Sequence, residues 1–354
     1  MSWERTEAYD RYDRFSEDDV RVRANRRGSR PRTKQRPDHE DAVEGFVLTV
    51  DRGRYTCLVD EGRRKRERTV LAATARELGR KSVVVGDRVS LVGDVSGEPG
   101  SLARIVRIAE RDTLLRRSAD DSDRVERIIV ANADQLCVVV AAARPEPRPR
   151  LIDRYLVAAY DAGIEPFVVI TKTDLARADA IRELVAPLDV PVFETALDVP
   201  PPAELRSQLS EHITVMVGHS GVGKSTLVNA LVPKAGRATG RVNAVTGRGR
   251  HTSSSSLALR VEDAQGANGW IIDTPGVRSF GLGHVDSEAV FTAFPGLARI
   301  VAECPRGCTH RADAPDCELD AAMESGELDA VGAARVASLR RLLASMEAGE
   351  DTAA

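Results

Sequence analysis

Residues 218–226 read GHSGVGKST and combine the residue types that bind nucleotide phosphates. The spacing is that of the G-x-x-x-x-G-K-[ST] loop, in which backbone N–H groups surround phosphate oxygens at a helix N-terminus. An apolar run precedes the loop and a helical stretch follows it, as such a loop requires. We expect Lys224 to reach the β- and γ-phosphates and Ser225 to bind Mg²⁺. The predicted phosphate-binding residues are Gly218, His219, Ser220, Gly221, Val222, Gly223, Lys224, Ser225 and Thr226.

A second phosphate motif, Asp273-Thr-Pro-Gly276, follows the strand-like run 270–272, 49 residues after Lys224. An acidic residue at the end of a neighbouring strand can hold Mg²⁺ through water, and a glycine N–H can contact the γ-phosphate. The tetrapeptide alone also fits an ordinary turn. Its place after a strand and downstream of the phosphate loop favours Asp273 and Gly276 as nucleotide-binding residues.

The segment 247–256, between these motifs, is rich in small and hydroxyl residues and suits a loop that orders around a γ-phosphate and Mg²⁺. Thr252 is our candidate ligand for both, with Ser253 as the alternative. Val277 stands where many GTPases place the glutamine that orients water, so hydrolysis needs another group of this chain or a partner that supplies one. His251 is the candidate for orienting water or stabilising charge, and a surface histidine without a catalytic role is an equally good interpretation. The predicted catalytic set is His251, Thr252 and Lys224.

Residues 171–174, Thr-Lys-Thr-Asp, follow the apolar run 166–170 and resemble the [NT]KxD element of GTPases. The resemblance implies that the aspartate accepts hydrogen bonds from N1 and N2 of guanine, and that the lysine lies along the base. A carboxylate there repels adenine, which presents an acceptor at N1. The implied base-binding residues are Thr171, Lys172, Thr173 and Asp174, with Thr195 and Ala196 from the loop after the next strand. This element precedes the phosphate loop by about fifty residues, which indicates a circularly permuted GTPase.

Three cysteines and one histidine lie within fourteen residues, at Cys304, Cys308, His310 and Cys317. Four N/S ligands at such spacing are typical of a closed, tetrahedral, structural Zn²⁺ site. The remaining cysteines, Cys57 and Cys137, lie in strand-like runs, which favours ordinary core thiols.

The elements that must position these residues fall into distinct regions. The chain has 354 residues, 42% of them hydrophobic, which is enough to form sizeable cores. Its net charge of -3 does not indicate nucleic-acid binding by the protein as a whole, so any basic surface must be local. Five short strand-like runs between 42 and 108 predict a small barrel such as an OB-fold. Residues 116–134 are expected to be a link. Beyond them, strands alternate with helical stretches, which predicts a doubly wound α/β sheet.

These regions predict an N-terminal OB-fold β-barrel, a central circularly permuted P-loop α/β GTPase and a C-terminal helical zinc-binding domain. The expected boundaries are 41–112, 113–286 and 287–354, preceded by a disordered basic arm at 1–40. Residues 20–37 of this arm carry eight basic residues and no acid, which fits RNA contact or a solvated tail equally well. A second basic cluster, at 63–68, is expected in a barrel loop, where RNA contact is favoured.

Taken together, a barrel, TKTD, GHSGVGKST, GRGRHTS, DTPGVRSFGL and the Cys/His cluster resemble the RsgA (YjeQ) family of small ribosomal subunit biogenesis GTPases. The resemblance covers residue 42 to the C-terminal helices. It implies GTP hydrolysis stimulated by the 30S subunit, late in small-subunit maturation, with 16S rRNA contacts through the barrel and zinc domains. The implied cofactors are GTP/GDP, Mg²⁺ and one structural Zn²⁺. Thr171 stands where asparagine is commoner in the family.

The cellular setting follows from the same reading. No apolar run is long enough to span a membrane and no secretory signal is visible, so we expect a cytoplasmic monomer with no membrane contact. The alternative function is a nucleotide-regulated RNA-binding module with negligible turnover. An ATPase or kinase is disfavoured by Asp174.

Overall fold

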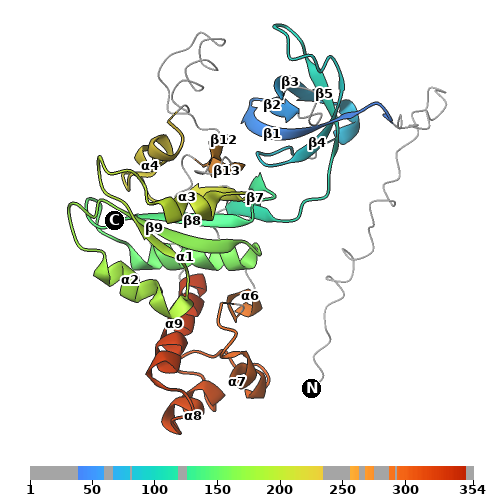
Figure 1. Cartoon of the computed structure of the whole chain (residues 1–354). Coiled ribbons are helices and arrows are strands. Elements are labelled where there is room, and N and C mark those ends of the chain that lie inside the picture. The colour runs from blue at the N-terminus through green and yellow to red at the C-terminus, as the bar shows by residue number, and fades with distance from the viewer. Residues whose placement is uncertain are drawn as a thin grey trace, which may run out of the picture. The chain divides into compact units, whose positions relative to one another are not determined.

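The computed structural model describes residues 39–59, 67–79, 82–118, 126–233, 256–262, 268–274, 287–291 and 293–347 (Figure 1). Several predicted features lie outside these ranges: the basic arm up to residue 38, residues 63–66 of the basic cluster, and His251, Thr252, Ser253, Gly276 and Val277. No helix within these ranges has both the length and the apolar character that crossing a membrane requires.

Five strands in the described part of the N-terminal region close into a barrel, as predicted. Their order is β1-β2-β3-β5-β4, and β4 returns to pair with β1. Strands β3 and β5 are parallel, and the other neighbours are antiparallel. Side chains that alternate along the strands fill the interior, where Val47, Cys57, Val70 and Leu91 are fully buried. The elements are β1 (Val43–Asp51), β2 (Arg54–Val59), β3 (Arg68–Thr74), the short η2 (Arg76–Leu78), β4 (Arg88–Gly93) and β5 (Ala103–Ile108).

The central sheet has the strand order β10-β9-β8-β11-β13-β12 among the described residues. The five strands β10, β9, β8, β11 and β13 are parallel to one another, and β12 is antiparallel to β13. Strand β11, which leads into the phosphate loop, therefore lies in the middle, although three strands of this sheet precede it in the chain. Because β9 and β11 are parallel, the guanine motif and the phosphate loop leave the sheet at the same edge. The strands are β8 (Gln135–Ala141), β9 (Glu165–Thr171), β10 (Val192–Glu194), β11 (Ile213–Val217), β12 (Leu257–Glu262) and β13 (Asn268–Asp273).

Helices cover both faces of this sheet, and successive strand residues, which point to opposite sides, pack against different helices. Val138 of β8 belongs to a buried cluster with Leu156 of α1. Its neighbour Val139 belongs to a second cluster, with Leu205 of α3 and Leu227 of α4. This arrangement is the predicted doubly wound α/β layering. The helices are α1 (Pro149–Asp161), α2 (Asp179–Val185), the short η3 (Ala186–Leu188), α3 (Ala203–Leu209) and α4 (Lys224–Leu231).

The segment 116–134, expected to be a link, contains strands that the sequence did not predict: β6 (Leu114–Ser118) and β7 (Glu126–Ala131) pair as an antiparallel hairpin. The hairpin joins the barrel to the sheet. The Asn132 amide donates to the Gly86 carbonyl at 2.9 Å, and the Ala131 N–H donates to the Val85 carbonyl at 3.1 Å. The backbones approach so closely that a Cβ on Gly86 would lie 2.0 Å from the Ala131 oxygen. Only glycine fits at this joint.

A second contact joins the barrel to the β12–β13 ribbon. Thr49 of β1 pairs with Leu257 of β12. Both guanidinium Nη atoms of Arg260 donate to the Glu67 carboxylate, at 2.6 and 2.7 Å, and the guanidinium lies 5.0 Å from the centre of the Trp270 ring. Arg260 and Trp270 are cross-strand partners. The barrel therefore contacts the strands that lead from the switch segment to Asp273.

The C-terminal helices are α6 (Ser287–Phe291), α7 (Ala298–Glu303), α8 (Glu318–Glu324) and α9 (Ala330–Glu347). Helix α9 lies against α1 of the GTPase sheet (Figure 1). Arg341 of α9 donates to both oxygens of Asp153 on α1, at 3.0 and 3.1 Å, and to the Leu184 carbonyl at 3.0 Å. Asp153 is 1% exposed, and this burial raises its pKa even though Arg341 opposes the shift. A contact between the buried Asp153 and the partly exposed Arg341 therefore joins the helical region to the sheet.

Candidate nucleotide site and metal centre

The phosphate loop runs from the end of β11 to the start of α4. Gly218 is buried, and a Cβ there would lie 2.5 Å from the Val139 carbonyl oxygen. Gly223, the residue before α4, has φ 98°, in the left-handed region that favours glycine. Ser225 and Thr226 lie exposed on the first turn of α4. Ser220 and Gly221 are also exposed, so the loop presents its backbone and its hydroxyls to solvent.

Lys224 connects this loop with the second phosphate motif. Its Nζ lies 3.2 Å from Oδ1 of Asp273 and donates to the Thr274 carbonyl at 3.1 Å. The Thr274 hydroxyl in turn donates to the Met216 carbonyl of β11 at 3.0 Å. The predicted phosphate lysine and the predicted magnesium-binding carboxylate therefore lie together at the ends of neighbouring parallel strands.

The guanine motif is bonded directly to the phosphate loop. The Thr171 hydroxyl donates to the Val222 carbonyl and lies 3.3 Å from that of Val140. Lys172 donates from Nζ to the Gly221 carbonyl at 2.7 Å, and also to the carbonyl of Arg144. A threonine at 171 thus supplies a hydroxyl that contacts the loop. These bonds fix the two motifs relative to each other.

Asp174 is exposed and held by the loop after β10. Its Oδ1 accepts a hydrogen bond from the Leu197 N–H at 3.1 Å. The Thr173 N–H donates to the Thr195 carbonyl at 3.3 Å, and the Thr195 N–H donates to the Ile170 carbonyl at 2.8 Å. One carboxylate oxygen is therefore oriented by the protein.

One cavity of about 640 Å³ is lined by both motifs. This volume lies within the range of about 300–1,000 Å³ typical of small-ligand sites. From the guanine side the lining includes Lys172, Asp174, Thr195 and Ala196, and from the phosphate side Gly223 and Thr226. The structure thus brings predicted base-binding residues and the start of α4 to one cavity.

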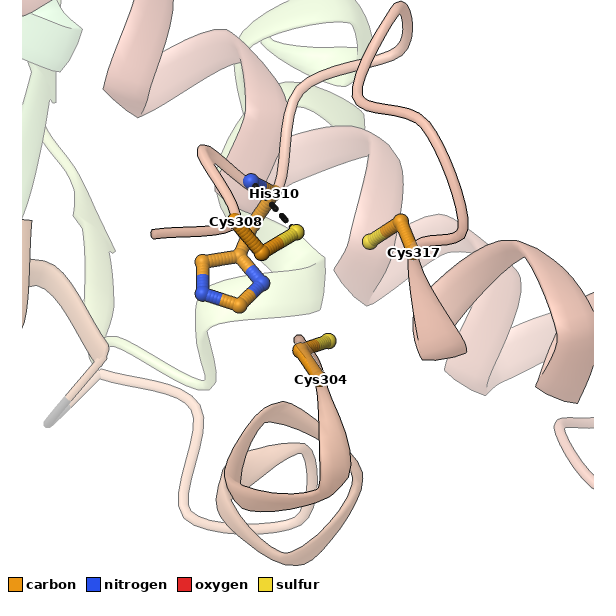
Figure 2. Close-up of side chains that lie close together, drawn as sticks. All are labelled: Cys304, Cys308, His310 and Cys317. Atoms are coloured by element: carbon orange, nitrogen blue, oxygen red, sulfur yellow. Dashed lines mark hydrogen bonds between the residues drawn. The ribbon is translucent and has the colours of Figure 1, made fainter. Parts of the chain in front are cut away.

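Cys304, Cys308, His310 and Cys317 converge on one point between α7 and α8 (Figure 2). Their ligand atoms all lie within 4.8 Å of one another. Tetrahedral Zn²⁺ with Zn–S bonds of about 2.3 Å places its sulfurs about 3.8 Å apart, so the four side chains need only small movements to close on an ion. The sequence prediction of a common cluster is confirmed.

Backbone and neighbouring side chains hold the histidine of this cluster in place. His310 has φ 55°, and its N–H donates to the Cys308 sulfur at 3.4 Å. Phe291 packs edge-on against the imidazole at 5.1 Å. Arg340 of α9 donates to the His310 carbonyl at 3.2 Å and to Asp320 of α8 at 2.7 Å. Helix α9 therefore supports the cluster directly.

The chemistry of the donor set fits a dication. Within the described part of the chain, Nδ1 of His310 is buried and lacks a hydrogen-bond partner. Burial, together with the neighbouring sulfurs of Cys317 and Cys308, raises the pKa of the Cys304 thiol to about 11. Three thiolates side by side require a cation to stabilise them, and an unpaired imidazole nitrogen supplies the fourth ligand. The cluster is consistent with a zinc ion.

The other two cysteines lie elsewhere. Cys57 is buried in the barrel, and burial raises its pKa to about 12. Cys137 is buried in β8, and burial raises its pKa too, although nearby Lys224 opposes the shift. Both are core thiols, as predicted.

Comparison with known proteins agrees with this geometry. Residues 108–283 match the family model described as RsgA GTPase. The chain is 37% identical over 273 residues to the small ribosomal subunit biogenesis GTPase RsgA of Pseudomonas aeruginosa, covering 75% of this chain and 76% of that protein. It belongs to the RsgA family. The corresponding protein of Chlorobaculum parvum is 33% identical over 299 residues, or 82% and 94% of the two chains.

Solved structures show the same fold. The crystal structure of YjeQ from Thermotoga maritima matches with a TM-score of 0.61 and 26% identity, over 86% of this chain and 98% of that one. The structure of YloQ, described as a circularly permuted GTPase, matches with a TM-score of 0.58 and 24% identity, over 86% and 96%. This chain is therefore an RsgA-family GTP hydrolase with an N-terminal barrel, a permuted GTPase domain and a C-terminal Cys₃His cluster.

Three residues of the site were not predicted from the sequence. The Arg144 carbonyl accepts from Lys172, the Leu197 N–H donates to Asp174, and Arg206 of α3 lines the cavity. The first two act through backbone atoms, which leave no signal in residue type. Arg206 lies in an ordinary amphipathic helix, and only the tertiary packing shows where it points.

Proposed function

We propose that this chain hydrolyses GTP as a late maturation factor of the small ribosomal subunit, with turnover stimulated by the 30S particle. The observation that carries the proposal is the single cavity shared by Asp174 and the start of α4, which suits a molecule with a guanine at one end and phosphates at the other. The named relatives act in small ribosomal subunit biogenesis, and the chain matches them over most of its length.

The residues divide into two sets. Asp174 accepts from the guanine edge, Lys172 lies along the base, and Thr195 and Ala196 support the base from their loop. Gly218 to Gly223 present backbone N–H groups to the phosphates, while Lys224 contacts the β- and γ-phosphate oxygens. An ammonium already paired with Asp273 at 3.2 Å can exchange part of that contact for phosphate oxygens.

Magnesium, when bound, neutralises charge on the β- and γ-phosphates. Ser225 at the start of α4 and Thr252 of the switch segment are its proposed ligands, with Asp273 acting through water. The Gly276 N–H senses the γ-phosphate, and His251 orients water or stabilises developing charge in place of the missing glutamine. Ser225 follows Lys224 at the start of α4, and Lys224 contacts Asp273 at 3.2 Å, so both proposed magnesium residues lie near this lysine.

Zinc, when bound, holds the loop between α7 and α8 as a structural crosslink. Cys304, Cys308, Cys317 and Nδ1 of His310 would hold it. We propose that this zinc-binding region, spanning 287–354, and the barrel, spanning 41–112, contact 16S rRNA on either side of the GTPase domain at 113–286. The chain would act as a monomer in the cytoplasm, where the 30S subunit is assembled.

The test is phosphate release from GTP and from ATP, with and without purified 30S subunits, using Lys224→Ala as the inactive control. We expect slow release from GTP alone, a large increase with 30S, and none from ATP. Turnover that stays flat while RNA binding responds to nucleotide would instead indicate an RNA-binding module regulated by GTP. Equal turnover of ATP would overturn the guanine assignment.

A further inference from the structure

Helix α3 contacts several parts of the nucleotide site. It follows the guanine-side loop 195–202 directly. Its apolar residues Leu205 and Leu209 share a buried cluster with Leu227 of α4. At its end, the Leu209 carbonyl lies so close to β13 that a Cβ on Gly269 would be 1.9 Å from that oxygen. The helix therefore lies between the guanine loop, the phosphate helix α4 and the strand that carries Asp273.

Arg206 makes the polar contact between α3 and α4. Its Nη1 donates to the Leu231 carbonyl at 3.2 Å, and its Nη2 donates to the Ala230 carbonyl at 3.0 Å. The last four carbonyls of a helix have no partner within the helix, and a positive charge at that end complements the helix dipole. The guanidinium thus caps the C-terminus of α4. It also lines the cavity that Asp174 lines.

The opposite end of α4 is already fixed. Thr171 and Lys172 of the guanine motif donate to the carbonyls of Val222 and Gly221, just before the helix begins. Eight residues at 1.5 Å per residue make α4 about 12 Å long. Apolar packing of Leu227 and Leu231 already holds α4 against α3. Apolar contacts are not directional, so the bonds from Arg206 are what set the position of the last turn along the helix axis. A shift of α4 along its axis moves its first turn relative to the guanine side.

We propose that Arg206 is a positioning residue for guanine-nucleotide binding, which keeps the phosphate helix and the guanine loop at the separation that one nucleotide spans. The inference rests on the proposed function and names a residue that determines the affinity of the site for GDP and GTP. When only a fraction of molecules has the two halves correctly placed, the apparent Kd rises by the inverse of that fraction. Loss of the two charge-assisted bonds is expected to weaken binding of GDP and GTP about tenfold.

The experiment compares Arg206→Ala and Arg206→Lys with the wild type, and uses Arg182→Ala as the matched control. Arg182 is also a helical arginine, its Nε contacts the Glu194 carboxylate at 2.5 Å, and it is not among the described residues that line the cavity. The measurements are the Kd and dissociation rate of fluorescent GDP, KM and kcat for GTP, and Tm. The Ala variant should raise Kd and KM about tenfold with kcat within twofold of wild type. The Lys variant, which keeps the charge but not the planar fork, should raise both about threefold.

The control should stay within twofold of wild type in every measurement. A Kd that is unchanged in Arg206→Ala while Tm falls would overturn the inference, because it would show a structural cap without a role in binding. If the Ala variant does not fold, an unchanged Kd in Arg206→Lys overturns it equally. Wild-type protein that binds neither GDP nor GTP would overturn the proposed function itself, which separates the two failures.

Discussion

Replacing Asp174 by asparagine should change which base the site accepts. Oδ1 of Asp174 is already occupied by the Leu197 N–H at 3.1 Å, and an asparagine can keep this bond only by placing its carbonyl oxygen there. Its NH₂ group must then point into the cavity, where the second carboxylate oxygen would accept from guanine N1 and N2. Hydrogen bonds to a charged group contribute about 1.5–3 kcal/mol each. Loss of two costs about 3–6 kcal/mol, which corresponds to a Kd for GDP raised roughly 10²- to 10⁴-fold.

The assay is competition of GDP and xanthosine diphosphate for a fluorescent nucleotide. Xanthine carries a carbonyl where guanine carries the 2-amino group, so the new NH₂ of Asp174→Asn should donate to it, and xanthosine diphosphate should bind more tightly than GDP. Asp198→Asn is the matched control, because that carboxylate also lines the cavity but holds no backbone N–H among the described contacts. Since Asp174 is exposed, Tm should not move. Unchanged GDP affinity, or equal losses for both nucleotides, would refute the assignment of Asp174 to the base.

Three further outcomes are expected. Cys317→Ser should lose stoichiometric zinc, measured by elemental analysis, and lower Tm; retained zinc would remove this residue from the ligand set. Because burial raises the pKa of Asp153, the native state holds more protons than the unfolded chain, so wild-type stability should fall as pH rises from about 4 through that raised pKa. The Tm of Asp153→Asn should lack this fall, and a difference between the two proteins that does not vary with pH would contradict it. Gly218→Ala places a methyl group 2.5 Å from the Val139 oxygen, which should cost about 1–3 kcal/mol and abolish GDP binding; normal binding by titration would show that the loop can shift.

Much of the architecture could be predicted because it depends on local patterns. Alternating apolar residues specify the barrel strands, and the continuous apolar run 136–141 specifies a strand buried on both faces. The phosphate loop, the guanine element and the Cys/His cluster carry their chemistry in residue type and spacing. The order of motifs predicted the permutation, and the parallel pairing of β11 with β8 and β13 shows how the sheet accommodates it.

The unpredicted features depend on contacts between distant segments. The β6–β7 hairpin is not predicted from the sequence, because Arg116 and Arg117 follow only two apolar residues and no alternation develops. Its strands are held by the barrel loop at Gly86 and by Asn132, and neither contact is visible in the sequence. The contact of Arg206 is not predictable for a similar reason. A residue of one helix that caps the C-terminus of another leaves no pattern in the sequence of either helix. The roles of Thr252 and His251 stay predictions, because both lie outside the described residues.

The pairing of Thr49 with Leu257 has a consequence for solubility. Strand β12 ends the row of strands in the nucleotide-binding sheet, and a bare terminal strand offers unpaired N–H and C=O groups to any other chain. In this molecule β1 occupies part of that position, and Arg260 with its Glu67 partner adds charge alongside it. The barrel therefore shields the sheet from self-association, and a shortened protein lacking it should precipitate even where its P-loop remains intact.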